Sequence, residues 1–381
     1  MLRKSNSLFF STSIVVKRRL YHELSFAQHG DPLQVLQYHE LQPSQQQNSN
    51  HVTVEMKYAA WNPADVNQVQ GKYPSLASPS WRQSSVTQRN VAGAEGIGVV
   101  IHVSELENAD SSNKPLKVGD TVITVGGIGT FRSHVSLPFE YVLPVFSKQQ
   151  QSTSTQHPFC PHDAIFFQLV GTAYNLLQQG NENGAIVQNA GNSAVATILA
   201  QMTRTPIVSF VRRRSNLLEM DLLHDYVTST SHTKILIEDE YIHDRNKIRA
   251  LREEWNFQTA FNAVGGLSSQ LLLQLLQPNG WHVTYGGMSQ QPVSVSTSDL
   301  IFRNVQLKGY WHSQWMWQQS YESRVAFVQQ LVRDYYDSSS AGIQLPPVQV
   351  FPLRDWAEAL RWEKAQTGPI RSKIVFDLSV E

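Results

Sequence analysis

The residues from Gln188 to Ala196 have the composition of a turn that binds a diphosphate. This segment reads QNAGNSAVA, with a short apolar run before it and a helical pattern after it. Small residues allow the backbone N–H groups at a helix start to approach phosphate oxygens, and Asn192 and Ser193 add side-chain donors. An ordinary turn between a strand and a helix has a similar composition, so the segment by itself leaves both interpretations open.

Three consecutive arginines, Arg212 to Arg214, follow this turn at the distance where a dinucleotide site recognises the adenosine ribose. An NAD site carries an acid about 20 residues after the turn, where it binds the ribose 2′-OH. Guanidinium groups suit a 2′-phosphate instead, because they form charge-assisted hydrogen bonds with it. The arginines therefore predict NADPH as the cofactor. A solvated basic cap on a helix is the alternative.

Metal chemistry is not expected from the cysteine and histidine content. The chain has one cysteine, Cys160, and 13 histidines. A single thiol can form neither an intrachain disulfide nor a four-thiolate zinc site. The histidines form no H-E-x-x-H or Cys/His motif, so we expect them to be scattered over the surface. Cys160 is expected to be a free thiol rather than a nucleophile.

The elements that would position these residues fall into two patterns. From Val52, apolar and polar residues alternate, which indicates a half-buried antiparallel strand. Further short strands are predicted at Gly96–Val103 and around Val118–Val125, separated by turns that contain Gly and Pro. The first 160 or so residues are therefore expected to form a β-barrel.

Near residue 165 strands begin to alternate with helices. Strands are predicted at Ala185–Gln188, Pro206–Val211, Lys234–Glu238, Thr259–Ala263 and Trp281–Tyr285, and helical segments at Ala194–Met202 and Leu271–Leu276. This alternation is typical of βαβ units around a parallel sheet. A helix at Tyr321–Tyr336, a strand at Val348–Phe351, a helix from Asp355 and a strand at Ser372–Phe376 follow. We expect this last part to rejoin the barrel.

The first 20 residues differ in composition from the rest. They are basic, contain several serines and carry no acid before Glu23, as organelle transit peptides do. We expect a mitochondrial transit peptide and a location in the matrix; a plastid peptide and a disordered tail are the alternatives. Elsewhere the 31 basic and 31 acidic residues balance, which gives no argument for nucleic acid as a partner. No apolar run is long enough to predict a membrane span.

Segments spread along most of the chain, from about residue 52 to the end, resemble a known family. They are Ala60–Asn67, Gln70–Pro74, Gly93–Gly96, Val118–Asp120, Gly129–Arg132, Gln188–Ser193, Ala263–Gly266, Val283–Met288, Gly309–Trp315 and Ser372–Lys373. Together they resemble the mitochondrial trans-2-enoyl-CoA/ACP (2-enoyl thioester) reductases, in the zinc-free, quinone-oxidoreductase-like branch of the medium-chain dehydrogenase/reductase superfamily.

This resemblance implies an α/β fold in which a GroES-like β-barrel catalytic domain precedes a Rossmann domain with a doubly wound parallel sheet. We expect the transit peptide at residues 1–21, the catalytic domain at 22–165, the NADPH-binding domain at 166–313 and a return to the catalytic domain at 314–381. In zinc-containing relatives the position of Ala94 is a metal-binding His. Its replacement here implies that no metal is bound.

The resemblance also implies roles for individual residues. Tyr73 is the implied proton donor. The implied cofactor-binding residues are Asn192, Ser193, Ala194 and Val195 in the phosphate turn; Arg212, Arg213 and Arg214 at the 2′-phosphate; Tyr285, Gly286, Gly287, Met288, Tyr310, Trp311, His312 and Ser313 around the nicotinamide and the acyl pocket; and Lys373 from the C-terminal strand. Three positions depart from the family pattern: Leu169 replaces an Asn that contacts the cofactor, and Ala194 and Ala196 replace glycines.

The implied reaction is hydride delivery from NADPH to C3 of a trans-2-enoyl thioester, carried by acyl carrier protein or coenzyme A. Negative charge then develops on the thioester oxygen, where nearby donors stabilise it. A phenol with an ordinary pKa near 10 stays protonated at neutral pH, so Tyr73 can protonate C2. The resemblance further implies a homodimer through the edge strands of the Rossmann sheets.

Several alternatives remain open at this point. On the same scaffold the chain could be an NADPH:quinone oxidoreductase, or a protein that binds NADPH without catalysis. Tyr73 could be a packing residue in a turn. The aromatic residues Tyr310, Trp311, Trp315 and Trp317 could line an acyl channel or lie in the core between the domains.

Overall fold

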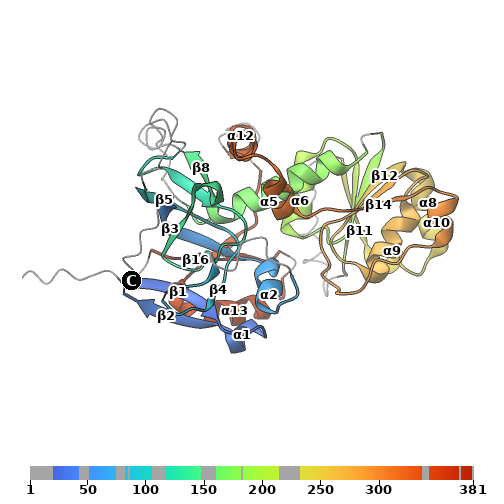
Figure 1. Ribbon diagram of the computed structural model, residues 1–381. Coiled ribbons are helices and arrows are strands. Elements are labelled where there is room, and N and C mark those ends of the chain that lie inside the picture. The colour runs from blue at the N-terminus through green and yellow to red at the C-terminus, as the bar shows by residue number, and fades with distance from the viewer. Residues whose placement is uncertain are drawn as a thin grey trace, which may run out of the picture.

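The chain folds into two lobes joined by one long helix (Figure 1). The computed structural model describes residues 20–42, 51–73, 82–84, 86–104, 116–146, 160–181, 183–213, 232–336, 343–368 and 370–379. Residues 1–19, which hold most of the predicted transit peptide, lie outside the described residues. Within the described part, no helix has the length and apolar character needed to cross a membrane.

The first lobe is built from antiparallel strands. Its larger sheet contains β3 (His51–Trp61), β5 (Gly96–Val103), β6 (Thr121–Thr124), β7 (His134–Pro138) and β8 (Val142–Phe146), and its smaller sheet contains β1 (Tyr21–Phe26), β2 (Gln37–Leu41) and β4 (Asn90–Val91). In the sequence, the short helix α1 (Pro32–Val35) lies between β1 and β2, and the short helix α2 (Pro63–Val69) lies between β3 and β4. Strand β1 begins at Tyr21, the last residue of the predicted transit peptide.

The C-terminal segment returns to this lobe, as the sequence predicted. Strand β15 (Val348–Pro352) pairs in parallel with β16 (Lys373–Asp377), and β16 pairs antiparallel with β3. Helix α13 (Trp356–Ala365) connects the two strands. The apolar core of the lobe therefore joins residues more than 300 positions apart; Trp61 and Phe376, for example, are both almost fully buried in it.

The second lobe is a six-stranded parallel sheet. Its strands are β9 (Ala185–Gln188), β10 (Ile207–Val211), β11 (Thr233–Ile237), β12 (Phe257–Asn262), β13 (Trp281–Thr284) and β14 (Gln306–Gly309), in the spatial order β11-β10-β9-β12-β13-β14. This is the doubly wound order of a dinucleotide-binding fold, which reverses direction beside the first strand, β9. The predicted Rossmann sheet is confirmed.

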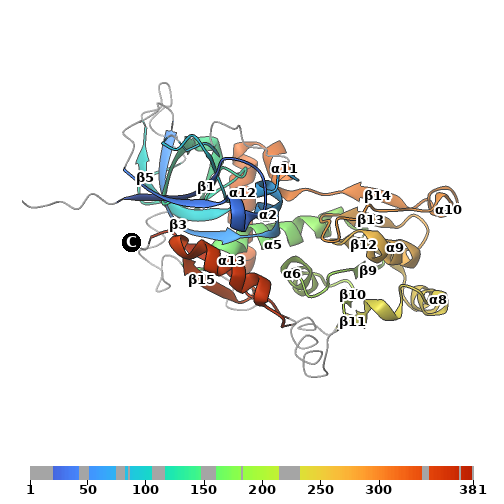
Figure 2. The ribbon, with the colours of Figure 1, turned by 90° about the horizontal axis from the view of Figure 1, so that it is seen from below.

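Helices cover both faces of this sheet. Helix α6 (Ala194–Met202) lies on the face toward the barrel lobe, and α8 (Arg245–Glu254), α9 (Gly266–Leu275) and α10 (Thr297–Ile301) lie on the other side (Figures 1 and 2). The two faces have separate apolar cores. The helix starts and strand ends that could hold a ligand thus meet at the carboxyl edge of the sheet.

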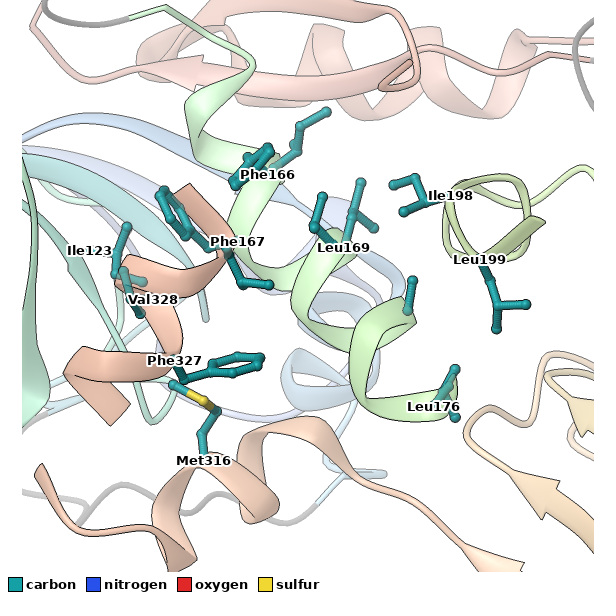
Figure 3. Close-up of a cluster of buried hydrophobic side chains, with 14 of the residues drawn as sticks. Ile123, Phe166, Phe167, Leu169, Leu176, Ile198, Leu199, Met316, Phe327 and Val328 are labelled. Atoms are coloured by element: carbon teal, nitrogen blue, oxygen red, sulfur yellow. The ribbon is translucent and has the colours of Figure 1, made fainter. Parts of the chain in front are cut away.

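Helix α5 (Asp163–Gln179) joins the lobes. It carries apolar side chains on several sides, so it can pack against both lobes at once. It packs against β3 and β5 of the barrel, against α6 of the second lobe, and against α11 (His312–Gln318) and α12 (Tyr321–Leu331). Figure 3 shows α5 side chains such as Phe167 and Leu169 within this core, between Phe327 of α12 and Ile198 of α6. Relative placement of the lobes therefore depends on burial of apolar surface along α5.

Most predicted elements lie where the periodicity placed them. Strands β5 and β9 and helix α6 have the predicted bounds, and other predicted ends differ by one to five residues. The helix predicted at Tyr321–Tyr336 is α-helical only to Leu331 and continues as a π-helical turn from Val332 to Tyr336. Periodicity cannot distinguish these two helical forms, because it does not report which carbonyl each N–H group reaches.

Candidate active site

The phosphate turn lies at the carboxyl end of β9, where α6 begins. Ser193 is the N-cap of α6, and its Oγ accepts a hydrogen bond from the Ala196 N–H at 3.4 Å. Ala190 adopts a left-handed conformation with φ of 49°, which turns the chain from the strand into the helix. The N–H groups of Ala194 and Val195 have no acceptor among the described residues. Open donors at a helix start are the chemistry that a diphosphate needs.

Two of the three departures from the family pattern, Ala196 and Leu169, lie in the packed core. Ala196 is fully buried, and Leu169 is 6% exposed in the cluster that joins α5 to α6 (Figure 3). A fully buried methyl group cannot contact a ligand in an open site, so Ala196 affects the packing between strand and helix. Leu169 contributes apolar packing at its position and offers no polar contact.

The arginine segment leaves the sheet at the end of β10. Arg212 and Arg213 are exposed, whereas Arg214 lies outside the described residues. Arg213 forms an ion pair with Glu240, with 2.5 Å between Nη2 and Oε1. Arg212 lies near the carboxylate of Glu238; burial raises the pKa of Glu238, and the Arg212 charge opposes this rise. Of the two described arginines, Arg213 thus already has a carboxylate partner.

Two loops at the carboxyl ends of β12 and β13 pack on each other. Residues 263–266 follow β12, and Met288 donates its backbone N–H to the Ala263 carbonyl at 3.0 Å. A Cβ at Gly286 would come within 2.9 Å of the Ala263 oxygen, so this contact requires glycine. Tyr285 points its buried hydroxyl toward Ser193 of the phosphate turn, and burial raises the pKa of this phenol to about 12. The hydroxyl oxygen makes no hydrogen bond among the described residues.

The segment after β14 contributes a buried polar pair. A 2.9 Å hydrogen bond joins the Tyr310 hydroxyl to Nδ1 of His312. Burial raises the pKa of Tyr310 and lowers the pKa of His312 to about 4, so both are neutral at physiological pH. Ser313 begins α11 with His312, and Trp311 is exposed.

Asn175 of α5 is a polar residue that the sequence analysis missed. It is 4% exposed, it lies beside the Tyr310 hydroxyl, and its Nδ2 has no hydrogen-bond partner among the described residues. A buried amide group without a partner costs free energy, which a bound ligand can recover. The signal was present in the sequence, since Thr172 and Asn175 are polar residues three positions apart within the largely apolar stretch Leu169–Leu177.

Tyr73 comes from the barrel lobe, in the turn after α2. Its side chain is 42% exposed, which does not fit a packing residue. Its backbone N–H donates to the Asn67 carbonyl, and Gly71 makes the turn with φ of 73°. The neighbouring Lys72 donates from Nζ to Oε1 of Gln290 at 3.3 Å. This bond places the Tyr73 turn next to the loop that follows Tyr285.

A group of buried charges lies at the junction of α2, β16 and the loop before β5. Glu95 accepts hydrogen bonds from Asn62 Nδ2 at 3.1 Å and from the Gln168 backbone N–H of α5 at 3.0 Å. Burial raises the pKa of Asp65 to about 7 and that of Glu95 to about 8. Burial lowers the pKa of Lys373, and the carboxylates of Glu363, Glu95 and Asp65 oppose this. Lys373 thus lies among three carboxyl groups.

The tryptophans that follow β14 lie in different environments. Trp315 packs edge-on against Phe327, with 5.0 Å between ring centroids. Trp317 contacts Tyr141 of the barrel and lies under the Arg324 guanidinium. Trp315 therefore packs against the core between the lobes, and Trp317 packs against the core of the barrel lobe. Trp311, which is exposed, is free of both cores.

Within the described part of the chain, we find no metal-binding cluster and no reactive thiol. No three His, Cys, Asp or Glu side chains there converge in a way that could hold a metal ion. Cys160 donates from Sγ to Asp163 at 3.2 Å, and burial beside this carboxylate raises the pKa of the thiol to about 11. A thiol with this pKa stays protonated and is a poor nucleophile at neutral pH.

The described residues fit a phosphorylated dinucleotide. The open N–H groups of Ala194 and Val195 can bind the diphosphate, and the exposed Arg212 can bind a 2′-phosphate. The unpartnered hydroxyl group of Tyr285 can form a hydrogen bond with a ligand further along the edge of the sheet. These groups lie along the carboxyl edge of one sheet, where parallel α/β folds bind nucleotides. Tyr73 reaches this edge from the other lobe through the contact between Lys72 and Gln290.

Comparison with known proteins places the chain among reductases. Residues 48–147 match the family model for the alcohol dehydrogenase GroES-like domain. The mitochondrial enoyl-acyl-carrier-protein reductase of Rattus norvegicus is 31% identical, over 88% of this chain and 84% of that protein. The enzyme of the same name from Bos taurus is 30% identical, over 97% of this chain and 91% of that protein.

Solved structures agree with this placement. A variant of the mitochondrial 2-enoyl thioester reductase of Candida tropicalis, in complex with NADP and crotonyl-CoA, is 25% identical and superposes with a TM-score of 0.75. The match covers 94% of this chain and 99% of that one. A heterodimer of the same yeast reductase gives a TM-score of 0.77 at 24% identity, over 94% of this chain and 99% of that one.

The buried charges around Glu95 make the stability depend on pH. The pKa of Glu95 is raised in the folded protein, so the folded state holds a proton that the unfolded state has already released. The stabilisation that comes from binding this proton is therefore lost, and the free energy of unfolding falls, as the pH rises from about 5 to 8. In Glu95→Gln the decline over this range should be shallower, by up to about 1.4 kcal/mol per pH unit.

Thermal unfolding measured as a function of pH tests this prediction. Glu358→Gln, a change at an exposed residue of α13, is the matched control and should keep the wild-type profile. Identical profiles for Glu95→Gln and the wild type would contradict the assignment of the proton to Glu95.

Proposed function

Since the chain belongs to the mitochondrial enoyl-acyl-carrier-protein reductase family, we propose that it uses NADPH to reduce the C2–C3 double bond of trans-2-enoyl thioesters. The rat and bovine relatives carry this activity in their names, and the yeast reductase binds NADP and crotonyl-CoA. The thioester would be carried by acyl carrier protein or by coenzyme A. This step belongs to mitochondrial fatty acid synthesis.

One observation within the chain supports the proposal most directly. An unpartnered phenol, Tyr285, and the open helix start at Ala194 lie on one edge of the sheet, and the turn that carries Tyr73 contacts the loop beside them. A dinucleotide extended along this edge would have its phosphates at α6 and its nicotinamide between the two lobes. We therefore assign cofactor binding to residues 166–313 and the catalytic domain to residues 22–165 and 314–381.

NADPH, when bound, supplies the hydride for C3 of the substrate. The chain must then stabilise negative charge at the thioester oxygen and deliver a proton to C2. Tyr73 is the proposed proton donor, because its exposed phenol can reach a ligand between the lobes. Tyr310 and His312 are neutral and hydrogen-bonded to each other, so they can shape the pocket without adding charge.

The remaining predicted residues are assigned by their position. Gly287 has no atom within 4 Å of where a Cβ would lie, and Met288 is 64% exposed, so this loop leaves room for a ligand. Ser313 begins α11 beside His312. We propose that these residues, with Trp311, line the nicotinamide and acyl pocket. Lys373 would act on the cofactor indirectly, through the carboxylates around it.

Quinone reduction on the same scaffold is the second candidate function. It needs hydride transfer to a quinone but no proton donor at a carbon atom. The exposed Tyr73 distinguishes the two candidates, because only the enoyl thioester reaction depends on a positioned acid at C2.

We also propose that the chain acts as a homodimer in the mitochondrial matrix. The basic segment before β1 has the composition of a mitochondrial transit peptide, and the rat and bovine relatives are named mitochondrial. Strand β14 lies at the edge of the six-stranded sheet and pairs only with β13 among the described strands. Leu307 in this strand and Ile301 and Phe302 just before it are 42%, 64% and 81% exposed. An exposed edge strand with exposed apolar side chains in it and beside it favours pairing with a second copy.

Tyr73→Phe tests the assignment of the proton donor. Removing the hydroxyl should lower kcat by about 10²–10⁴, the usual range for general acid catalysis, and should leave the NADPH Kd nearly unchanged. Oxidation of NADPH by crotonyl thioesters measures this. Tyr38→Phe is the control, because the Tyr38 hydroxyl bonds His22 in the small sheet, away from the site. Undiminished turnover in Tyr73→Phe would remove this residue from the role.

Arg212→Ala tests the recognition of the 2′-phosphate. Loss of one charged hydrogen bond should weaken NADPH binding by roughly 1.5–3 kcal/mol and leave NADH binding unchanged, because NADH has no 2′-phosphate. Fluorescence titration with both cofactors measures the difference. Arg361→Ala, at an exposed position of α13, is the control. Equal losses of affinity for NADPH and NADH would argue against a 2′-phosphate site at Arg212.

Leu307→Lys tests the dimer. In a two-fold pairing of β14 strands the two added charges would face each other, so the variant should sediment as a monomer and the wild type as a dimer. Val118→Lys, at an exposed aliphatic residue of the barrel lobe, should leave the mass unchanged. A Leu307→Lys protein that remains dimeric would place the interface elsewhere.

A further inference from the structure

Asn189 lies fully buried between the end of β9 and the phosphate turn. Its side chain uses both of its polar ends. Oδ1 accepts the Ala263 backbone N–H at 2.7 Å, and Nδ2 donates to Asn262 Oδ1 at 2.8 Å and to Ser268 Oγ at 2.9 Å. One side chain therefore connects the phosphate turn to the loop that follows β12 and to helix α9.

Asn262 repeats this arrangement one strand further along the sheet. Its Oδ1 accepts the backbone N–H groups of Val264 at 3.2 Å and Gly265 at 3.0 Å, and its Nδ2 donates to Thr284 Oγ1 at 3.1 Å. The two carboxamides hold the ends of β9, β12 and β13 in a single buried network. His282, which burial keeps neutral by lowering its pKa to about 4, completes the network near Thr284.

The loop held by these residues supports the next one. The Val264 carbonyl accepts hydrogen bonds from the Ser289 N–H at 2.9 Å and from Ser289 Oγ at 2.6 Å. Gln290, the next residue, accepts the bond from Lys72 beside Tyr73. A continuous series of hydrogen bonds thus runs from the phosphate turn, through two loops, to the barrel lobe.

We infer that Asn189 is a positioning residue that sets the nicotinamide end of the NADPH site relative to the phosphate turn. It contacts neither Tyr73 nor the arginine segment, yet it fixes the 263–266 loop against which residues 286–290 pack. The inference rests on the proposed NADPH site. It predicts that binding of the nicotinamide half of the cofactor depends on Asn189 more than binding of the adenosine half does. The adenosine half needs only the phosphate turn and the arginines.

Asn189→Asp keeps the shape of the side chain but places a carboxylate oxygen against Asn262 Oδ1. Asn262 cannot rotate to compensate, because its Oδ1 also accepts two backbone N–H groups. In this variant, affinity for NADPH and turnover at saturating NADPH should each fall by about 10- to 100-fold, as expected when buried hydrogen bonds are lost. Affinity for adenosine 2′,5′-bisphosphate, which lacks the nicotinamide half, should change less than about twofold.

Titration of both ligands on the full-length protein, with thermal unfolding measured in parallel, is the experiment. Asn189→Ser is the second variant; it is neutral and too short to reach Asn262, so it keeps the test valid if the buried charge prevents folding. The control is Thr259→Val, which removes buried hydrogen bonds to Asn181 at the opposite end of β12. It should lower the melting temperature and leave both ligand affinities unchanged.

Selective loss of NADPH affinity in the Asn189 variants supports the inference. Equal loss for NADPH and the bisphosphate, or no loss for either in folded protein, overturns it. The measurements of ligand affinity do not require the protein to catalyse a reaction. A wild type that binds NADPH but never oxidises it with enoyl thioesters would therefore contradict the proposed function and leave the test of Asn189 intact.

Discussion

The arrangement of this protein depends on the burial of one apolar helix between two lobes. Helix α5 packs against β3 and β5 of the barrel, against α6 of the parallel sheet and against α11 and α12. Phe166, Phe167 and Leu176 of α5 are at most 6% exposed within this core. Burying such side chains contributes roughly 1.5–3 kcal/mol each. Because the same helix borders both lobes, its packing decides how the Tyr73 turn faces the carboxyl edge of the sheet.

Buried polar groups at the carboxyl edge of the parallel sheet differ in whether they have hydrogen-bond partners inside the protein. Asn189 and Asn262 use both ends of their side chains inside the protein, so they hold loops in place. By contrast, Tyr285 and Asn175 each leave one buried polar atom without a partner among the described residues. Buried polar atoms without partners are rare in folded proteins and are explained at a binding site by the ligand they would contact. Asn189 and Asn262 thus hold the loops of the site in place, whereas Tyr285 and Asn175 are candidates for contact with the proposed cofactor.

The buried acids Asp65 and Glu95 illustrate how position changes chemistry. Their pKa values rise to about 7 and 8 because burial disfavours the charged form. The carboxyl group of Glu95 accepts hydrogen bonds from Asn62 of the barrel and from the backbone of α5. It thereby links the barrel to the helix that joins the lobes.

The sequence by itself determined the fold class, the family and the course of the chain through both lobes. Alternating and helical periodicities report which faces are buried, and β9, α6 and the return of the C-terminal strand to the barrel were all predictable from them. The QNAGNSAVA segment and the arginines after β10 carried their chemistry in residue type and spacing, because both belong to one local βαβ unit.

Only the tertiary structure decided how distant residues combine. The contact between Lys72 and Gln290 joins positions 218 apart, and the bond between Asn189 and Asn262 joins positions 73 apart. No local pattern encodes these pairs, since each depends on strand order and on the packing of α5. The same holds for Lys373, whose neighbours are carboxyl groups from three separate segments, and for Trp315 and Trp317, which pack against different cores. Periodicity and motif spacing report what one segment can do, whereas burial and hydrogen-bond partners exist only once the segments meet.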